Sequence, residues 1–235
     1  MRLIKAGSWL GGLLCVLLAC GAARGAPAGP GLGYATYLGG DVRDVVHALA
    51  VDGSGNAWVA GRTESRNFPV TADAWQKSYG GGLSDAFVAK FSPSGELLYA
   101  TYLGGGRWDD IHALAVDGSG NVWVAGATRS ENFPVTADAW QKNERGYKDA
   151  FVARFSPSGQ LLYATYLGGN RGYEEAHALA VDGSGNVWVA GETRSTNFPV
   201  TADAWQKSYG GGGSDAFVAK FSPSGQLLYA TYLGG

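Results

Sequence analysis

The segment HALAVDGSGNAWVAG at His47–Gly61 returns almost unchanged at His112–Gly126 and His177–Gly191. A second segment follows each copy and ends in ATYLGG; its copies lie at Asp85–Gly105, Asp149–Gly169 and Asp215–Gly235. Successive copies are about 65 residues apart, and a regular repeat of this kind predicts an array of equivalent structural units. The repeat therefore decides the architecture, and a polar residue that occurs in every copy can serve the scaffold alone.

Each copy holds two pairs of apolar, β-favouring runs. In the second copy, residues 111–117 and 121–128 flank Gly118-Ser119-Gly120, and residues 149–156 and 160–167 flank Pro157-Ser158-Gly159. Such pairs predict two β-hairpins, or four antiparallel strands, per copy. The strands carry apolar residues on both sides, so both faces of each sheet require cover. This pattern predicts an all-β fold of β-propeller blades; a stacked solenoid is the alternative, although its repeats are shorter, about 20–45 residues.

The repeat boundaries divide the chain into blades at 41–105, 106–169 and 170–235, preceded by a lone copy of the fourth strand at 32–40. Closed propellers typically have about four to eight blades. Three complete blades plus one extra N-terminal strand therefore predict an open or partial propeller. Its unpaired blade edges are templates for a protein partner or for self-association.

The first 26 residues predict a signal peptide, because Arg2 and Lys5 precede a short apolar run at 9–19 and small residues follow. The run is shorter than the roughly 20 residues of a membrane-spanning helix. Residues 17–20 (LLAC) resemble a bacterial lipobox that would attach lipid at Cys20, and ordinary cleavage near Ala26 is the alternative. We expect an exported protein at the bacterial cell surface, in the periplasm or outside the cell, at most lipid-anchored to a membrane.

The composition excludes several classes of function. The only two cysteines, Cys15 and Cys20, both lie in the leader, which leaves the repeats without a disulfide or a cysteine metal site. The formal net charge is −2 and becomes more negative when the leader and its three basic residues are removed. A mildly acidic surface without basic clusters argues against nucleic acid as a partner. The sequence requires no cofactor.

An insert joins the two hairpins of each copy, at 67–84, 132–148 and 197–214. Its threonines, Thr71, Thr136 and Thr201, are suited to N-cap a short helical turn. Repeated aromatic residues on exposed loops suit sugar stacking, whereas the structural interpretation is that each tryptophan anchors its own insert by apolar burial. The aromatic residues concerned are Trp75, Trp140, Trp205, Tyr79, Tyr147 and Tyr209.

The three histidines, His47, His112 and His177, open the strand expected nearest the central axis. Three imidazoles around an axis could bind a transition metal. The preferred alternative is that each histidine bonds within its own blade, to the acid three residues earlier (Asp44, Asp109 or Glu174), because an open arc gives the rings no reason to converge.

The DGSGN segments that begin at Asp52, Asp117 and Asp182 place oxygen side chains at alternate positions, as calcium loops do. They lack the later bidentate acid of such a loop. A hairpin turn capped by the aspartate is therefore the favoured interpretation.

The combination of ATYLGG, an acidic pair, ALAVDGSGNVWVAG, T-x-S-x-NFPVT and DAFVAKFSPSG resembles the SBBP family, the bacterial beta-propeller repeat, over residues 32–235. The segment VDGSGNVWVAG is also similar to NHL-type propeller repeats. The resemblance implies an exported propeller, often a module of larger surface proteins, and it implies no established catalytic residues.

Catalytic motifs are missing from the sequence: it contains no G-x-S-x-G, no H-E-x-x-H and no phosphate-binding loop. Enzymes concentrate their chemistry in one asymmetric site, whereas here almost every polar residue occurs in triplicate. We therefore expect a protein that is not an enzyme and that acts as a protein-binding or cell-surface structural scaffold. The alternative is a lectin-like propeller that binds carbohydrate through the insert aromatics.

Overall fold

A computed structural model describes residues 33–170 and 172–235. Within these ranges all regular structure is β, in three sheets of four antiparallel strands each. The first sheet contains β1 (Asp44–Val51), β2 (Ala57–Thr63), β3 (Asp85–Phe91) and β4 (Leu97–Leu103). The second contains β5 (Asp109–Val116), β6 (Val122–Thr128), β7 (Asp149–Phe155) and β8 (Leu161–Leu167). The third contains β9 (Glu174–Val181), β10 (Val187–Thr193), β11 (Asp215–Phe221) and β12 (Leu227–Leu233).

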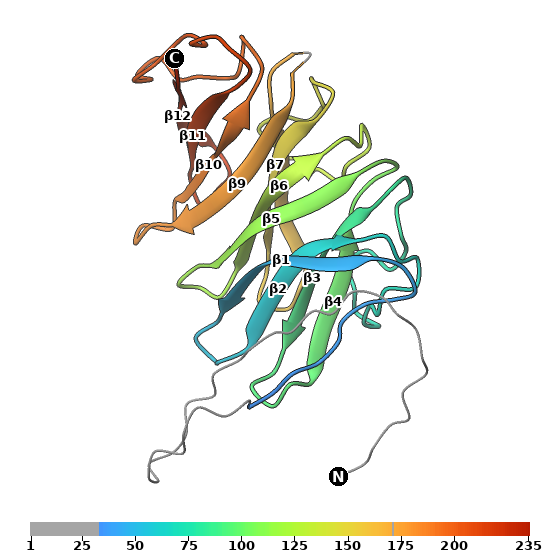
Figure 1. The fold of residues 1–235 in the computed structure, drawn as a ribbon. Coiled ribbons are helices and arrows are strands. Elements are labelled where there is room, and N and C mark those ends of the chain that lie inside the picture. The colour runs from blue at the N-terminus through green and yellow to red at the C-terminus, as the bar shows by residue number, and fades with distance from the viewer. Residues whose placement is uncertain (1–32, 171) are drawn as a thin grey trace.

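The strands of each sheet lie side by side in chain order, as the hairpin pattern predicts. The three sheets are arranged face to face like blades, and the first strands β1, β5 and β9 follow one another along one side of the array (Figure 1). This confirms β-propeller blades and rejects the solenoid alternative. The three described blades form an open arc.

The DGSGN segments are hairpin turns, as predicted. The Asp52 carboxylate accepts hydrogen bonds from the backbone N–H groups of Ser54 and Asn56, at 2.9 and 3.0 Å, and from the Asn56 side chain. Gly55 has a φ of 80°, a conformation that glycine adopts without a steric penalty. The aspartate oxygens are thus used within the turn itself, which orders the end of each blade.

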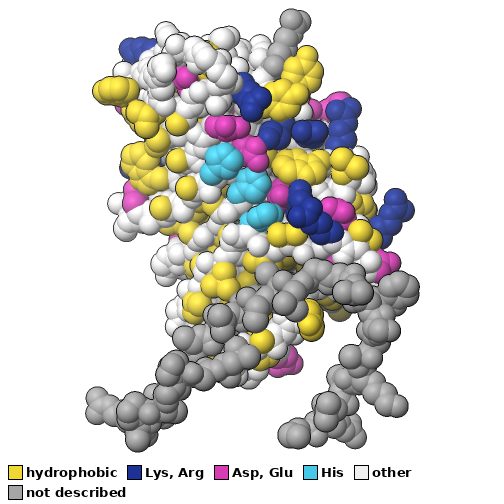
Figure 2. Space-filling view, viewed as in Figure 1, with side chains coloured by type: hydrophobic (Ala, Val, Ile, Leu, Met, Phe, Trp, Pro, Cys, Tyr) yellow, Lys and Arg dark blue, Asp and Glu magenta, His cyan; other side chains and the backbone are white. Residues whose placement is uncertain are grey.

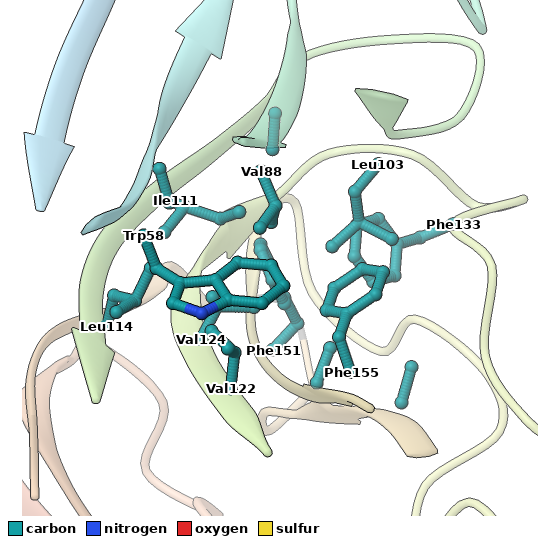
Figure 3. Packing of buried hydrophobic residues seen from close by; sticks show 14 of the residues in the cluster. Trp58, Val88, Leu103, Ile111, Leu114, Val122, Val124, Phe133, Phe151 and Phe155 are labelled. Atoms are coloured by element: carbon teal, nitrogen blue, oxygen red, sulfur yellow. The ribbon is translucent and has the colours of Figure 1, made fainter. Parts of the chain in front are cut away.

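Apolar packing holds neighbouring blades together. Trp58 of β2 is fully buried against Ile111 and Val122 of the second blade (Figure 3). Trp123, its counterpart in the second blade, is equally buried against the third blade. Trp188, the third counterpart, is 37% exposed because no described residue covers that face. Each apolar cluster between blades therefore contains residues of two neighbouring blades, and a blade buries its tryptophan only where another blade follows it.

A tyrosine of each fourth strand adds one polar contact between blades. The hydroxyl of Tyr99 donates to the backbone carbonyl of Gly159, and the hydroxyl of Tyr163 donates to that of Gly225 at 2.6 Å. Both carbonyls lie in the Pro-Ser-Gly turn of the following blade. The contact fixes the position of one blade relative to the next.

The lone fourth strand predicted at 32–40 does not form as a paired strand in the described part, residues 33–40. The third strand that would pair with it has no counterpart among the described residues. The segment nevertheless keeps the side-chain contacts of a fourth strand, since Tyr34 donates to the Gly95 carbonyl at 2.7 Å and Leu38 packs on the first blade. It thus covers part of the outer face of the first blade.

The inserts contain no helical turn, so the predicted N-cap role of the threonines is wrong. The Thr71 hydroxyl instead accepts a hydrogen bond from the backbone N–H of Ala100 at 3.2 Å, while the Thr71 N–H donates to the Ala100 carbonyl at 3.1 Å. The same pair of bonds joins Thr136 to Ala164, and Thr201 to Ala230. Each fourth strand is the edge of its sheet, and its backbone groups bond to the insert threonine. These bonds fix the insert on the strand in place of a local helical turn.

The predicted signal peptide, including Cys20, lies outside the described residues. Within the described ranges, the structure has no helix with the length and apolar character needed to cross a membrane.

Candidate functional site

The three histidines lie in one row across the first strands of the blades. The ring centroids of His47 and His112 are 5.6 Å apart, and those of His112 and His177 are 5.7 Å apart. Figure 2 shows the row on one face of the molecule, with acidic side chains beside it. The expectation that an open arc keeps these rings apart is therefore wrong, because β1, β5 and β9 are neighbours even when the ring of blades is open.

Acids of the second and third blades lie beside the row, and each faces the histidine of the blade before it. Nε2 of His47 lies 3.5 Å from Oδ2 of Asp110, and Nε2 of His112 lies 3.5 Å from Oε1 of Glu175. Nε2 of His112 also lies 3.6 Å from Oδ2 of Asp110. The corresponding residue of the first blade is Val45, so this carboxylate occurs in the second and third copies of the repeat and not in the first.

The acids proposed as partners within each blade have another role. Asp109 accepts hydrogen bonds from the hydroxyls of Thr128 and Ser130 and, at 2.8 Å, from the Gly105 N–H. Asp44 makes the corresponding contacts in the first blade. In each blade, this acid ties the start of the first strand to the end of the second strand. The predicted hydrogen bonds from these acids to the histidines are therefore wrong.

His47 and His112 differ in their electrostatic environment. Burial lowers the pKa of His47, and the opposing charge of Asp110 does not offset it. Burial also acts to lower the pKa of His112, but Asp110, Glu175 and the Ala176 carbonyl outweigh it, so the pKa of His112 is raised. The difference follows from His112 facing two carboxylates rather than one.

A pocket of about 420 Å³ opens on the same rim of the blades. Its aromatic wall consists of Trp108 and of Tyr147 and Tyr173, whose rings stack with centroids 5.7 Å apart. The guanidinium of Arg129 and the ammonium of Lys148 each lie 5.7 Å from the centre of the Trp108 ring. The remaining lining residues are Gly82, Leu83, Gly106 and Arg107.

The pocket and the histidine row are connected through Lys148. This side chain lies over the Trp108 ring and also contacts Oε2 of Glu175. Figure 2 shows basic, acidic, hydrophobic and histidine side chains gathered on this face. Together, the pocket and the row form one continuous surface, which we call the rim face.

The six insert aromatics do not form one repeated surface. Trp205 is 76% exposed and Trp75 is 36% exposed, whereas Trp140 packs against the apolar cluster that the second and third blades share. Tyr79 and Tyr209 pack edge-on against tyrosines of their own fourth strands, Tyr102 and Tyr232.

Tyr147 occupies a different position from the tyrosines with which the sequence grouped it. The second insert is one residue shorter, so that Tyr147 stands where the first insert has Leu83, and Glu144 stands in the place of Tyr79. Of the six predicted aromatics, Tyr147 is the one that lines the pocket.

Sequence reasoning missed Trp108, Tyr173, Asp110 and Glu175. Each stands at a repeat position that changes between copies: the positions of Trp108 and Tyr173 hold Arg43 in the first copy. The sequence feature that could have identified them is the variation between copies in the residues just before each histidine, at 43–45, 108–110 and 173–175.

The family model for SBBP, described as "Beta-propeller repeat", matches residues 33–69, 98–134 and 162–199. A curated relative, "Regulatory protein FlaEY" of Caulobacter vibrioides, is 27% identical over 217 residues, which cover 86% of this chain and 21% of the relative. The chain thus spans about a fifth of the length of this curated relative.

Proposed function

Because this chain belongs to the SBBP beta-propeller repeat family, we propose that it is a non-enzymatic scaffold that binds a protein partner on its rim face. The carrying observation is the pocket lined by Trp108, Tyr147 and Tyr173, three aromatic residues that the repeat does not require. A rigid array of sheets that presents changed residues at one rim is suited to recognition, since binding usually uses loops held by a rigid scaffold.

The chemistry of the pocket favours an acidic peptide segment with an apolar anchor. The stacked tyrosines and Trp108 offer the flat apolar area that dominates protein interfaces. Arg129 and Lys148 flank Trp108, and Arg107 stands at the edge, paired with Glu131 at 2.7 Å. A carboxylate of the partner can replace Glu131 on Arg107 in a bidentate pair.

The lectin alternative receives less support from the geometry. Exposure of the insert tryptophans differs between copies: Trp140 packs on the apolar cluster shared by the second and third blades, whereas Trp205 is 76% exposed. This is the behaviour of anchors rather than of a repeated sugar platform.

Export is part of the proposal and rests on the sequence alone. The charged start, the short apolar run and the LLAC segment that ends at Cys20 support a secreted or lipid-anchored product. The relative carries the words "regulatory protein" in its name. A binding scaffold is compatible with such a role, and we take nothing more specific from that likeness.

The test is selection from a displayed peptide library, followed by affinity measurement. We expect acidic peptides with an aromatic or aliphatic anchor, and we expect Trp108→Ala to weaken them at least tenfold. Trp205→Ala, which removes a more exposed tryptophan outside the pocket, is the matched control and should leave the affinity within twofold. No selected peptide, or equal loss in both variants, would refute the proposal. A glycan array in which binding depends on Trp205 would favour the lectin.

A second candidate partner is another blade of the same kind, on the open face of the third blade. Trp188 is partly exposed there, and Tyr229 has no following turn among the described residues to receive its hydroxyl, unlike Tyr163. Covering this face would repeat the two interfaces already present. Sedimentation velocity over a range of concentrations should show self-association that Trp188→Lys abolishes.

A further inference from the structure

Two histidines and one carboxylate converge at the end of the histidine row. One ligand atom from each of His112, Glu175 and His177 lies within 4.8 Å of the others. The residues come from β5 and β9, two neighbouring first strands that the blade packing holds together. We propose that these three side chains bind a divalent transition-metal ion such as Zn²⁺, a role that is independent of peptide binding in the pocket.

The hydrogen bonding of His112 prepares it as a ligand. Its Nδ1 lies 3.1 Å from the backbone carbonyl of Ala176, which can only accept, so Nδ1 carries the proton in the neutral ring. Nε2 then holds a free lone pair. A histidine that donates one ring N–H to a backbone carbonyl while the other nitrogen coordinates is the usual arrangement of a metal ligand.

The spacing of the polar atoms suits a bridging ion better than a direct hydrogen bond. Nε2 of His112 is 3.5 Å from Oε1 of Glu175, too long for a strong bond. Ligands about 2.0–2.2 Å from a tetrahedral zinc ion are separated from each other by about 3.4 Å. His177 is exposed and can rotate to complete three protein ligands, leaving one position for water or a partner group.

A second observation is the buried carboxylate of Asp110. Its side chain is 3% exposed, its Oδ1 has no hydrogen-bond partner, and its Oδ2 lies 3.6 Å from Nε2 of His112. Burying a carboxylate without hydrogen bonds is costly. Arg62, 3.7 Å from Oδ2, offsets part of that cost on the side of His47, and an ion bound at His112 would add positive charge on the other side.

The remaining charges set the balance of the site. Lys148 contacts Oε2 of Glu175 and leaves Oε1 directed at His112, and Arg62 lies 3.7 Å from Asp110 on the side of His47. These two cations offset the two carboxylates. Selectivity must therefore come from the imidazoles, which favour zinc, copper and nickel over magnesium and calcium.

His47 provides a matched control within the same row. It occupies the same repeat position as His177, but its blade has Val45 where the third blade has Glu175. It therefore has no carboxylate from its own strand, its ring faces Asp110 of the second blade at 3.5 Å, and it lies outside the three-residue cluster.

The experiment is an isothermal calorimetric titration of ZnCl₂ into untagged, chelator-treated full-length protein. We expect one ion per chain, a loss of affinity of at least tenfold in His177→Gln, and a change below twofold in His47→Gln. Copper EPR of the unmodified protein should show nitrogen couplings from two imidazoles. Circular dichroism of both variants without metal checks that they fold. No zinc binding, or equal loss in both variants, would overturn the proposal.

Discussion

The tyrosine contact between blades allows a sharp test of how the array is stabilised. Tyr163→Phe removes a hydroxyl that donates to the buried Gly225 carbonyl of the next blade and accepts a bond from the Trp140 N–H at 3.3 Å. Tyr229→Phe removes the equivalent hydroxyl of the third blade, which accepts from the Trp205 N–H at 3.2 Å but has no described carbonyl to donate to. The two changes therefore differ by one bond between blades.

The expected magnitude follows from what each change leaves behind. A typical internal hydrogen bond contributes about 1 kcal/mol net, and a buried carbonyl left without a partner costs about 1–3 kcal/mol. Tyr163→Phe should thus lower the free energy of unfolding by about 2 kcal/mol, which corresponds to roughly 4–8 °C in the melting temperature of a domain of this size. Tyr229→Phe should cost less than about 1 kcal/mol, because its partner is partly exposed to water.

The assay is equilibrium unfolding in urea, monitored by tryptophan fluorescence and by circular dichroism. Repeat proteins are stabilised mainly by contacts between neighbouring units, so the third blade can unfold as a separate unit. In that case the loss of unfolding free energy in Tyr163→Phe should appear in the first of two unfolding transitions. An unchanged urea dependence of the free energy would show that both variants expose the same surface. Equal losses in Tyr163→Phe and Tyr229→Phe would refute the idea that this bond couples the blades.

Three further predictions test burial, close backbone approach and a buried acid. Trp123→Ala should cost about 3–5 kcal/mol in urea unfolding and Trp188→Ala roughly half as much, since only the first is fully buried; equal costs would contradict the blade packing. Gly126→Ala would place a Cβ 2.0 Å from a carbonyl oxygen of β5 and should lower the melting temperature, whereas Gly118→Ala, with nothing within 4 Å, should not. Burial raises the pKa of Asp85 to about 7, so between about pH 4 and pH 7 the folded state binds a proton that the unfolded chain releases, and stability falls as the pH rises through this window. Asp85→Asn should reduce that slope between about pH 4 and pH 7, and an unchanged slope would argue against it.

The blades could be predicted from the sequence because their determinants are local. Alternating apolar strands fix which residues are buried, and Asp52 with Gly55 fixes the turn between two strands. The failed prediction at Thr71 has a tertiary cause, since its hydroxyl and N–H bind β4, about 30 residues later in the chain. Local propensity favoured a helix cap at Thr71, but the backbone groups at the unpaired edge of β4 bind this residue instead.

The candidate site could be predicted only in part, because it is built between blades. Sequence reasoning paired each histidine with an acid on its own strand, whereas His112 faces Glu175 on the next blade. It also grouped Tyr147 with Tyr79, although a deletion of one residue moves Tyr147 into the pocket. Neither contact is encoded in one copy of the repeat, since both depend on how two copies pack.

Because the copies are nearly identical in sequence, equivalent residues in different blades can be compared to distinguish structural from functional roles. Trp123 and Trp188 have the same neighbours in sequence, yet one is buried and the other partly exposed, so exposure here follows the position of a blade in the array. Position in the array cannot explain Trp108, Asp110 or Glu175, because the sequence itself changes there while the strands remain the same. Changed residues that lie together on one rim and contact one another are what a binding surface added to a repeated scaffold requires. The peptide experiment therefore addresses aromatic residues that the copies do not share, and the zinc experiment combines Glu175, absent from the first copy, with two histidines of the repeat.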